Sequence, residues 1–99
     1  MKLTTEKNGT ELTVHLSGEV NVNTAPELAT LLDEELPGVQ ALTLDFAECD
    51  YVSSAGLRVL LATFKRMSAA GGSMSFANVG QGLMDVFQIT GLACVFGLY

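Results

Sequence analysis

The sequence has few of the residues on which enzyme and metal sites depend. Its 99 residues include one histidine and two cysteines, which are too few for a zinc site of the usual ligands or for a disulfide framework. Neither a Gly-x-Ser-x-Gly nucleophile turn nor a phosphate-binding Gly-x-x-x-x-Gly-Lys loop occurs. The lone histidine, His15, lies on the polar face of a predicted strand, where a solvated or hydrogen-bonded side chain is the simpler interpretation. We therefore expect a protein that is not an enzyme and holds no metal or cofactor.

Long apolar stretches are also missing. No segment approaches the roughly 20 apolar residues of a membrane-spanning helix, and the first seven residues lack the apolar region of a signal peptide. A cytoplasmic protein without membrane insertion is therefore expected. Because 48% of the residues are apolar, one packed core is feasible, and we predict a single domain over residues 1–99. Cys49 and Cys94 are predicted to be buried in it as small apolar side chains.

Basic residues are absent from half of the chain. No lysine or arginine lies between Asn8 and Leu57, whereas nine carboxylates do, and the formal net charge is −6. An acidic surface repels a phosphate backbone, so nucleic acid is not expected as a direct partner. Simple solubility explains this acidity, and so does electrostatic steering toward a basic protein surface. The sequence leaves both explanations open.

Hydrophobic spacing predicts an α/β fold. Residues 12, 14 and 16 are apolar and alternate with polar ones, as in a strand with one buried face, and Asn8-Gly9 before them favours a hairpin turn. Apolar residues of the longest helix recur at helical spacing, and we expect Leu60, Leu61 and Phe64 in the core. The predicted elements are strands at 3–7 and 11–17, a helix capped by Asn23 or Thr24 and ended by Pro37-Gly38, a strand at 41–46, a helix from Ser53-Ser54 to Gly71-Gly72, a strand at 73–79, a helix at 83–89 and a strand at 94–98. This alternation favours right-handed crossovers and a mixed, largely parallel sheet with helices packed on it.

Two adjacent serines open the longest predicted helix. Ser53 is well placed as the N-cap, with its side-chain oxygen accepting a hydrogen bond from a backbone N–H two or three residues on. Ser54 is then the first helical residue, and a phosphate on its exposed hydroxyl is tolerated because a helix N-terminus favours an anion. Gly56, in the first turn, is explained by close packing or by a partner backbone that approaches there. The pair is therefore a cap and a candidate switch site.

Three segments resemble the STAS domain of bacterial anti-anti-sigma factors, also called anti-sigma factor antagonists. Ser53-Ser54-Ala55-Gly56-Leu57 is similar to the family's Asp-Ser-Ser/Thr-Gly-Leu signature, with Ser54 at the phosphorylated serine. Residues 16–25 are similar to its Gly-Glu-Leu-Asp…Thr-Ala segment, and residues 84–92 to its Thr-Gly-Leu ending. Ser53 and Asn21 stand where the family commonly has aspartates.

The resemblance implies a single STAS domain that binds an anti-sigma factor, commonly a serine kinase, and so releases a sigma factor to transcription. It also implies that this kinase phosphorylates Ser54 and that a PP2C-type phosphatase removes the phosphate. Two of these segments, residues 16–25 and 53–57, lie at the start of helices that follow strands, so they are predicted to meet at one rim of the sheet. There we expect a switch surface and a partner-binding surface, formed respectively by Ser53, Ala55 and Gly56, and by Glu19, Asn21, Asn23, Thr24, Tyr51 and Arg58.

Two other functions fit the same residues. One is a STAS docking module of a transporter or lipid-export complex, which neighbouring permease genes would favour over the kinase and phosphatase genes of a sigma pathway. The other is a nucleotide-binding domain, which a nucleotide titration would detect.

Overall fold

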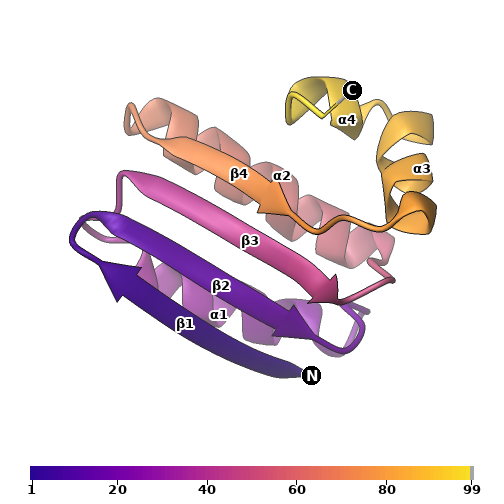
Figure 1. Cartoon of the computed structure of the whole chain (residues 1–99), viewed down its shortest axis with the longest axis horizontal. Helices are drawn as coiled ribbons and strands as arrows, with labels where there is room; N and C mark the ends of the chain where they lie inside the picture. Colours follow the sequence, from indigo (N-terminus) through magenta and orange to yellow (C-terminus); the bar gives the residue numbers. More distant parts are fainter. Residues whose placement is uncertain (99) are drawn as a thin grey trace.

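A β-hairpin forms the start of the chain and one edge of the sheet. The computed structural model describes residues 1–98. β1 (Lys2–Asn8) and β2 (Glu11–Ser17) pair antiparallel around Gly9, whose φ of 64° suits glycine. β2 pairs in parallel with β3 (Ala41–Glu48), and β3 in parallel with β4 (Ser73–Ala77), in the spatial order β1-β2-β3-β4 (Figure 1). The predicted mixed, largely parallel sheet is confirmed.

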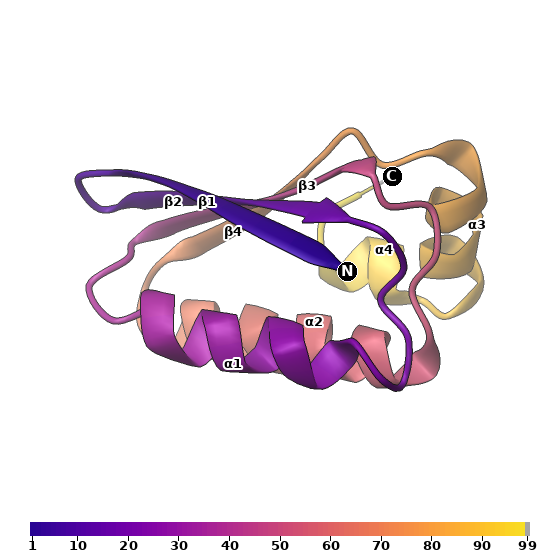
Figure 2. The same ribbon diagram turned by 90° about the horizontal axis from the view of Figure 1, so that it is seen from below.

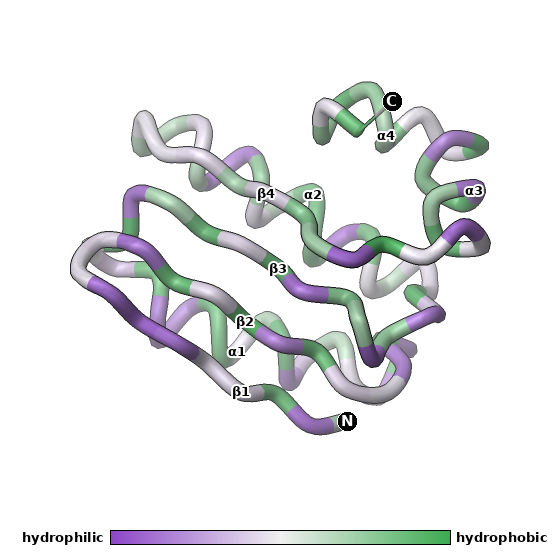
Figure 3. Tube along the Cα trace, viewed as in Figure 1, coloured by the Kyte–Doolittle hydropathy of each residue, from purple (hydrophilic) through white to green (hydrophobic). Residues whose placement is uncertain are grey.

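Two helices cover one face of this sheet. α1 (Ala25–Glu35) joins β2 to β3, α2 (Ser54–Ala69) joins β3 to β4, and both lie on the same side (Figure 2). Apolar side chains at alternate positions of β2 and β3 are buried beneath them, and Figure 3 shows this alternation along both strands. On the opposite face of these strands lie the partly exposed polar side chains, among them Thr13 and His15.

The core joins the sheet to both helices and extends past β4. Leu28 of α1 and Leu60 of α2 are fully buried, so the prediction for Leu60 is confirmed. Leu61 and Phe64 are only partly buried and pack against the edge of the core. All five phenylalanines of the chain gather near β4, with neighbouring ring centroids 4.6–6.4 Å apart. This cluster holds α3 (Gln81–Ile89) and α4 (Leu92–Val95) against the sheet edge and α2.

The end of the chain differs from the prediction. A strand was expected at 94–98, but residues 92–95 form α4, which follows Gly91 at a φ of 79°. Ala93 and Phe96 are buried whereas Cys94 and Val95 are exposed, which is a helical rather than an alternating pattern. The Phe96 ring stacks on Phe76 of β4 at 4.6 Å, so the aromatic cluster decides the conformation. The prediction that Cys94 is buried is therefore wrong, while Cys49 is buried as expected.

Three other boundaries shift by two residues, and the first is the end of β3 at Glu48 rather than residue 46. β4 ends at Ala77 rather than residue 79 because Asn78 takes a φ of 56°, outside the extended region. α3 begins at Gln81 rather than residue 83. Within residues 1–98, no helix combines the length and the hydrophobicity required to traverse a lipid bilayer.

Candidate functional site

The loops that precede α1 and α2 are bonded side by side at one end of the sheet. The Gly18 amide donates to the Glu48 carbonyl at 3.0 Å and the Val20 amide to the Tyr51 carbonyl at 3.0 Å. In return, the Ser53 amide donates to the Val20 carbonyl at 2.7 Å, and Val20 and Val52 form an isolated parallel bridge. We call residues 18–24 and 48–58 the rim. The backbone thus brings two of the three segments of the family resemblance together, residues 16–25 and 53–57.

The serine pair has the geometry expected of a helix start. Ser53 is extended, with φ −75° and ψ 173°, and its Oγ accepts a hydrogen bond from the Gly56 amide at 3.3 Å. The prediction of Ser53 as the N-cap is confirmed. Ser54 follows as the first residue of α2 and is exposed. Its hydroxyl is therefore accessible at the positive end of the helix dipole.

Gly56 fixes how closely α2 approaches the rim loops. A Cβ at this position would lie 2.6 Å from the Cγ1 atoms of both Val20 and Val52. The residue is buried, and Ala55 beside it is half-buried. Close packing rather than an approaching partner backbone therefore explains this glycine.

Asn21 and Thr24 organise the start of α1. Asn21 Oδ1 accepts from the backbone amides of Asn23 at 2.9 Å and Thr24 at 3.0 Å. Thr24 occupies the N-cap position but makes no side-chain cap, because its hydroxyl donates to the Glu19 carbonyl at 2.6 Å and accepts from the Asn21 amide at 2.8 Å. The predicted N-cap position at Thr24 is therefore confirmed, but neither Asn23 nor Thr24 caps the helix through its side chain. An aspartate at position 21 would supply the same acceptor oxygen, so asparagine preserves this turn.

Apolar and acidic side chains project from the rim. Glu19, Asn23, Tyr51 and Arg58 are exposed, and Asn21 and Thr24 are half-buried. Sequence reasoning missed Val22, a residue that is 71% exposed, while Tyr51 is 47% exposed. Val20 and Val22 both look like strand residues in the sequence, and only the bridge to Val52 makes one buried and the other exposed. The rim therefore combines two apolar anchors with charged neighbours, as protein-binding surfaces do.

Cys49 is a buried thiol within the rim. Burial raises its pKa, and the nearby carboxylates of Asp50 and Glu19 act in the same direction. Its Sγ donates to the Tyr51 carbonyl at 3.5 Å. The thiolate needed for nucleophilic chemistry is thus disfavoured.

The lone histidine belongs to a separate network of hydrogen-bonded polar side chains on the sheet face that α1 and α2 do not cover. His15 Nδ1 lies 2.8 Å from Asp45 Oδ2, and Nε2 lies 2.7 Å from Glu6 Oε2. These bonds raise the pKa of His15, with Glu6 as the larger cause. Asp45 Oδ1 accepts two hydrogen bonds, one from the Asn78 side-chain amide at 2.9 Å and one from the Ala47 backbone amide at 3.0 Å. These bonds lower the pKa of Asp45.

The bonds of His15 and the spacing of potential ligand side chains bear on catalysis and on metal binding. Both His15 ring nitrogens are bonded to carboxylates, so neither is left to activate a rim serine. Within residues 1–98, no three potential metal ligands lie close enough together to hold an ion.

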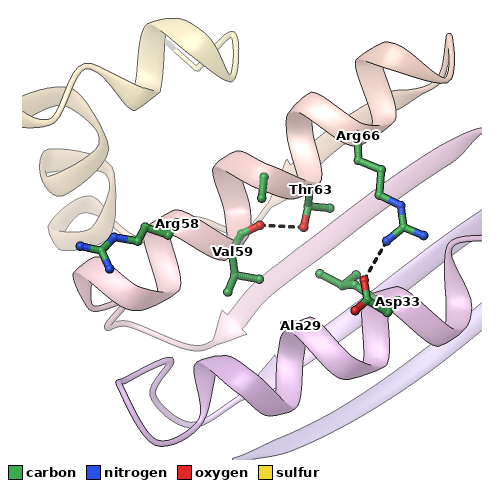
Figure 4. A pocket seen from close by; sticks show the side chains of 8 residues that line it. Ala29, Asp33, Arg58, Val59, Thr63 and Arg66 are labelled. Atoms are coloured by element: carbon green, nitrogen blue, oxygen red, sulfur yellow. Dashed lines mark hydrogen bonds and ion pairs between the residues drawn. The ribbon is translucent and has the colours of Figure 1, made fainter.

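A shallow groove of about 340 Å³ runs between α1 and α2 (Figure 4). Arg66 crosses it to Asp33, with Nη1 2.8 Å from Oδ1, and the Thr63 hydroxyl bonds back to the Val59 carbonyl at 2.7 Å. Half of its lining residues are apolar, and only Arg58 at one end also belongs to the rim. The groove is therefore largely separate from the serine pair.

Comparison with known proteins assigns the family. A family model described as "Mlab, STAS domain" matches residues 3–97. This chain belongs to the STAS domain family. Over 87 residues, this STAS domain is 32% identical to the anti-sigma-B factor antagonist of Bacillus subtilis, which covers 88% of this chain and 80% of that protein. It is 34% identical over 97 residues to BtrV of Bordetella bronchiseptica, which covers 97% of this chain and 84% of that protein.

A solved structure matches as well. The crystal structure of an anti-sigma factor antagonist from Mycobacterium paratuberculosis superposes with a TM-score of 0.82 at 26% identity, covering 99% of this chain and 84% of that one. The STAS fold and the family predicted from three sequence segments are confirmed.

Proposed function

We propose that this STAS domain is an anti-sigma factor antagonist switched by phosphorylation of Ser54. It binds an anti-sigma factor in the cytoplasm and thereby frees a sigma factor for transcription. The observation that best supports the proposal is the geometry of α2: Ser53 caps the helix and Ser54 follows it, exposed. The names of relatives at 32% identity support the antagonist role. In this role the domain acts by binding and is not an enzyme.

The partner contacts the rim. Its polar contacts come from Glu19, Asn21, Asn23, Thr24 and Arg58, and its apolar contacts from Tyr51 and the neighbouring Val22. The hydrogen bonds of Asn21 and Thr24 fix the first loop before binding, so less conformational entropy is lost when the complex forms. The exposed apolar pair supplies the kind of anchor that dominates interface energies.

Phosphorylation of Ser54 breaks the complex. The kinase transfers the γ-phosphoryl group of ATP to the Ser54 oxygen, ADP leaves, and a PP2C-type phosphatase hydrolyses the phosphate in the return step. The group adds almost two negative charges and considerable bulk beside Ser53, Ala55 and Gly56. Desolvating it in an interface without a cationic partner costs several kcal/mol, a large share of the about 8 kcal/mol of a micromolar complex.

A kinase assay with residue mapping tests the switch. The chain is used to capture its anti-sigma factor from a lysate of the source bacterium, and the purified kinase is then incubated with the chain and ATP. We expect one added phosphate, located on Ser54 by mass spectrometry, and none on Ser54→Ala. Ser53→Ala, a matched loss of the neighbouring hydroxyl, remains a substrate.

Two results would contradict the proposal. Phosphate on Ser53 would refute the residue assignment. Phosphate on neither serine would favour an unswitched docking module, such as one of a transporter or lipid-export complex.

A further inference from the structure

Arg58 is the basic residue of α2 nearest to Ser54. The helix contains three basic residues, Arg58, Lys65 and Arg66. Residues four apart on a helix have Cβ atoms about 5–6 Å apart, which places Arg58 one turn from Ser54. Lys65 and Arg66 begin roughly 16 Å further along the axis from Ser54. Only Arg58 therefore shares the surface of the first turn.

The guanidinium of Arg58 is directed toward that turn. Long side chains on a helix lean toward its N-terminus, and Figure 4 shows Arg58 extending toward the beginning of α2, whereas Arg66 reaches across to α1. Arg66 is paired with Asp33. Arg58 is exposed, and within residues 1–98 no carboxylate forms an ion pair with it.

We propose that Arg58 captures the phosphate on Ser54 within the same helix. The inference rests on the proposed function, because it takes Ser54 as the modified residue. A planar guanidinium binds phosphate oxygens through two parallel hydrogen bonds. An acidic group four residues before a basic one is also the favoured order on a helix.

This capture gives phosphorylation a second effect on the rim. Before modification, Arg58 is an exposed cation of the rim and is available to an acidic group of the partner. After modification, the guanidinium is bonded to the phosphate and the partner loses that contact. The switch thus removes an attractive group, while the captured phosphate, only partly neutralised by one guanidinium, still adds bulk and negative charge to the interface.

A phosphorus NMR titration tests the capture without any kinase. Phosphoserine is incorporated at position 54 during translation, and the second pKa of its phosphate, near 6 in isolation, is measured in the whole chain. An adjacent cation favours the dianion, so Arg58→Gln is expected to raise this pKa by roughly half a unit relative to the parent. Arg58→Lys, which keeps the charge but not the two parallel bonds, gives a smaller rise.

Lys65→Gln is the matched control, because it removes one positive charge from the same helix far from Ser54, and its phosphate pKa stays at the parent value. Backbone amide spectra of the unphosphorylated variants verify that they are folded. Equal phosphate pKa values in the parent and Arg58→Gln would overturn the capture while leaving phosphorylation of Ser54 intact. A kinase that ignores Ser54 would refute the proposed function, yet this titration would still report on Arg58.

Discussion

α1 and α2 begin at the same rim but use their polar side chains in opposite ways. At α1, the Thr24 hydroxyl turns away from the helix to the Glu19 carbonyl, and Asn21 binds two loop amides. At α2, Ser53 caps the helix in the ordinary way and Ser54 is exposed. At α1 the polar side chains hold the preceding loop in place, whereas at α2 the capped helix presents an exposed hydroxyl. This difference explains why only one of two neighbouring helix starts is suited to a switch.

The largest expected effect is at Gly56, which allows α2 to pack on the rim. Gly56→Ala places a Cβ 2.6 Å from Val20 and Val52. Overpacking costs about 1–3 kcal/mol and alanine's helix propensity returns up to about 1, so we expect the unfolding free energy in urea to be about 1–2 kcal/mol lower. Gly82→Ala in the first turn of α3, where no atom lies within 4 Å of the added Cβ, serves as the control and should not destabilise. Equal stability of both variants would show that the valines move aside freely.

Asn21 comes next, because it holds the loop at the start of α1. Asn21→Ala leaves the Asn23 and Thr24 amides without their side-chain acceptor and is expected to cost about 1 kcal/mol. Asn21→Asp keeps an acceptor oxygen and should stay within about 0.5 kcal/mol of the parent. Urea unfolding of both variants measures this. If the two variants lose equal stability, the turn does not depend on the acceptor.

Substituting each serine of the pair in turn should distinguish the helix cap, Ser53, from the proposed switch residue, Ser54. Ser53→Ala loses the bond to the Gly56 amide and should lower the unfolding free energy by about 0.5–1 kcal/mol. Ser54→Ala removes an exposed hydroxyl and should change it by no more than about 0.3 kcal/mol, although it abolishes switching. Thermal melts of both variants suffice for the comparison. A larger loss for Ser54→Ala would mean that Ser54, not Ser53, supports the helix.

The smallest expected effect lies away from both helix starts, in the pH dependence of the sheet face. The raised pKa of His15 means that its contribution is fully present below its ordinary value of 6.5 and is lost as pH rises through the raised one. The lowered pKa of Asp45 means that its contribution is present above 3.8 and is lost as pH falls through the lowered one. The stability that His15 and Asp45 contribute should therefore be greatest between pH 3.8 and 6.5.

His15→Gln should remove the decline in unfolding free energy above pH 6.5. Ser53→Ala should lower the whole curve without changing its slope, because a serine does not titrate in this range. Urea midpoints measured across the pH range separate the two regions. A parent curve that is flat above pH 6.5 would contradict the role of His15.

Local signals made much of α2 predictable from the sequence. Ser53, Ser54 and Gly56 form a helix start whose cap depends on residues within three positions of one another. The hydrogen bonding at the start of α1 was not predictable in the same way. The Thr24 hydroxyl donates to the Glu19 carbonyl only once the loop is folded against the neighbouring rim segment. Three strands in register, β1, β2 and β3, are likewise needed before His15 meets Glu6 and Asp45. The final apolar segment became α4 because Phe96 joins an aromatic cluster assembled from distant parts of the chain.

The most direct test of the switch is an amide NMR titration with the captured anti-sigma factor. The ¹⁵N-labelled chain is titrated once unmodified and once with phosphoserine at position 54. For the unmodified chain, we predict shifts concentrated at residues 19–24 and 51–58, with binding largely lost in the phosphorylated chain. Shifts confined to the opening hairpin, or equal binding by both forms, would contradict the account.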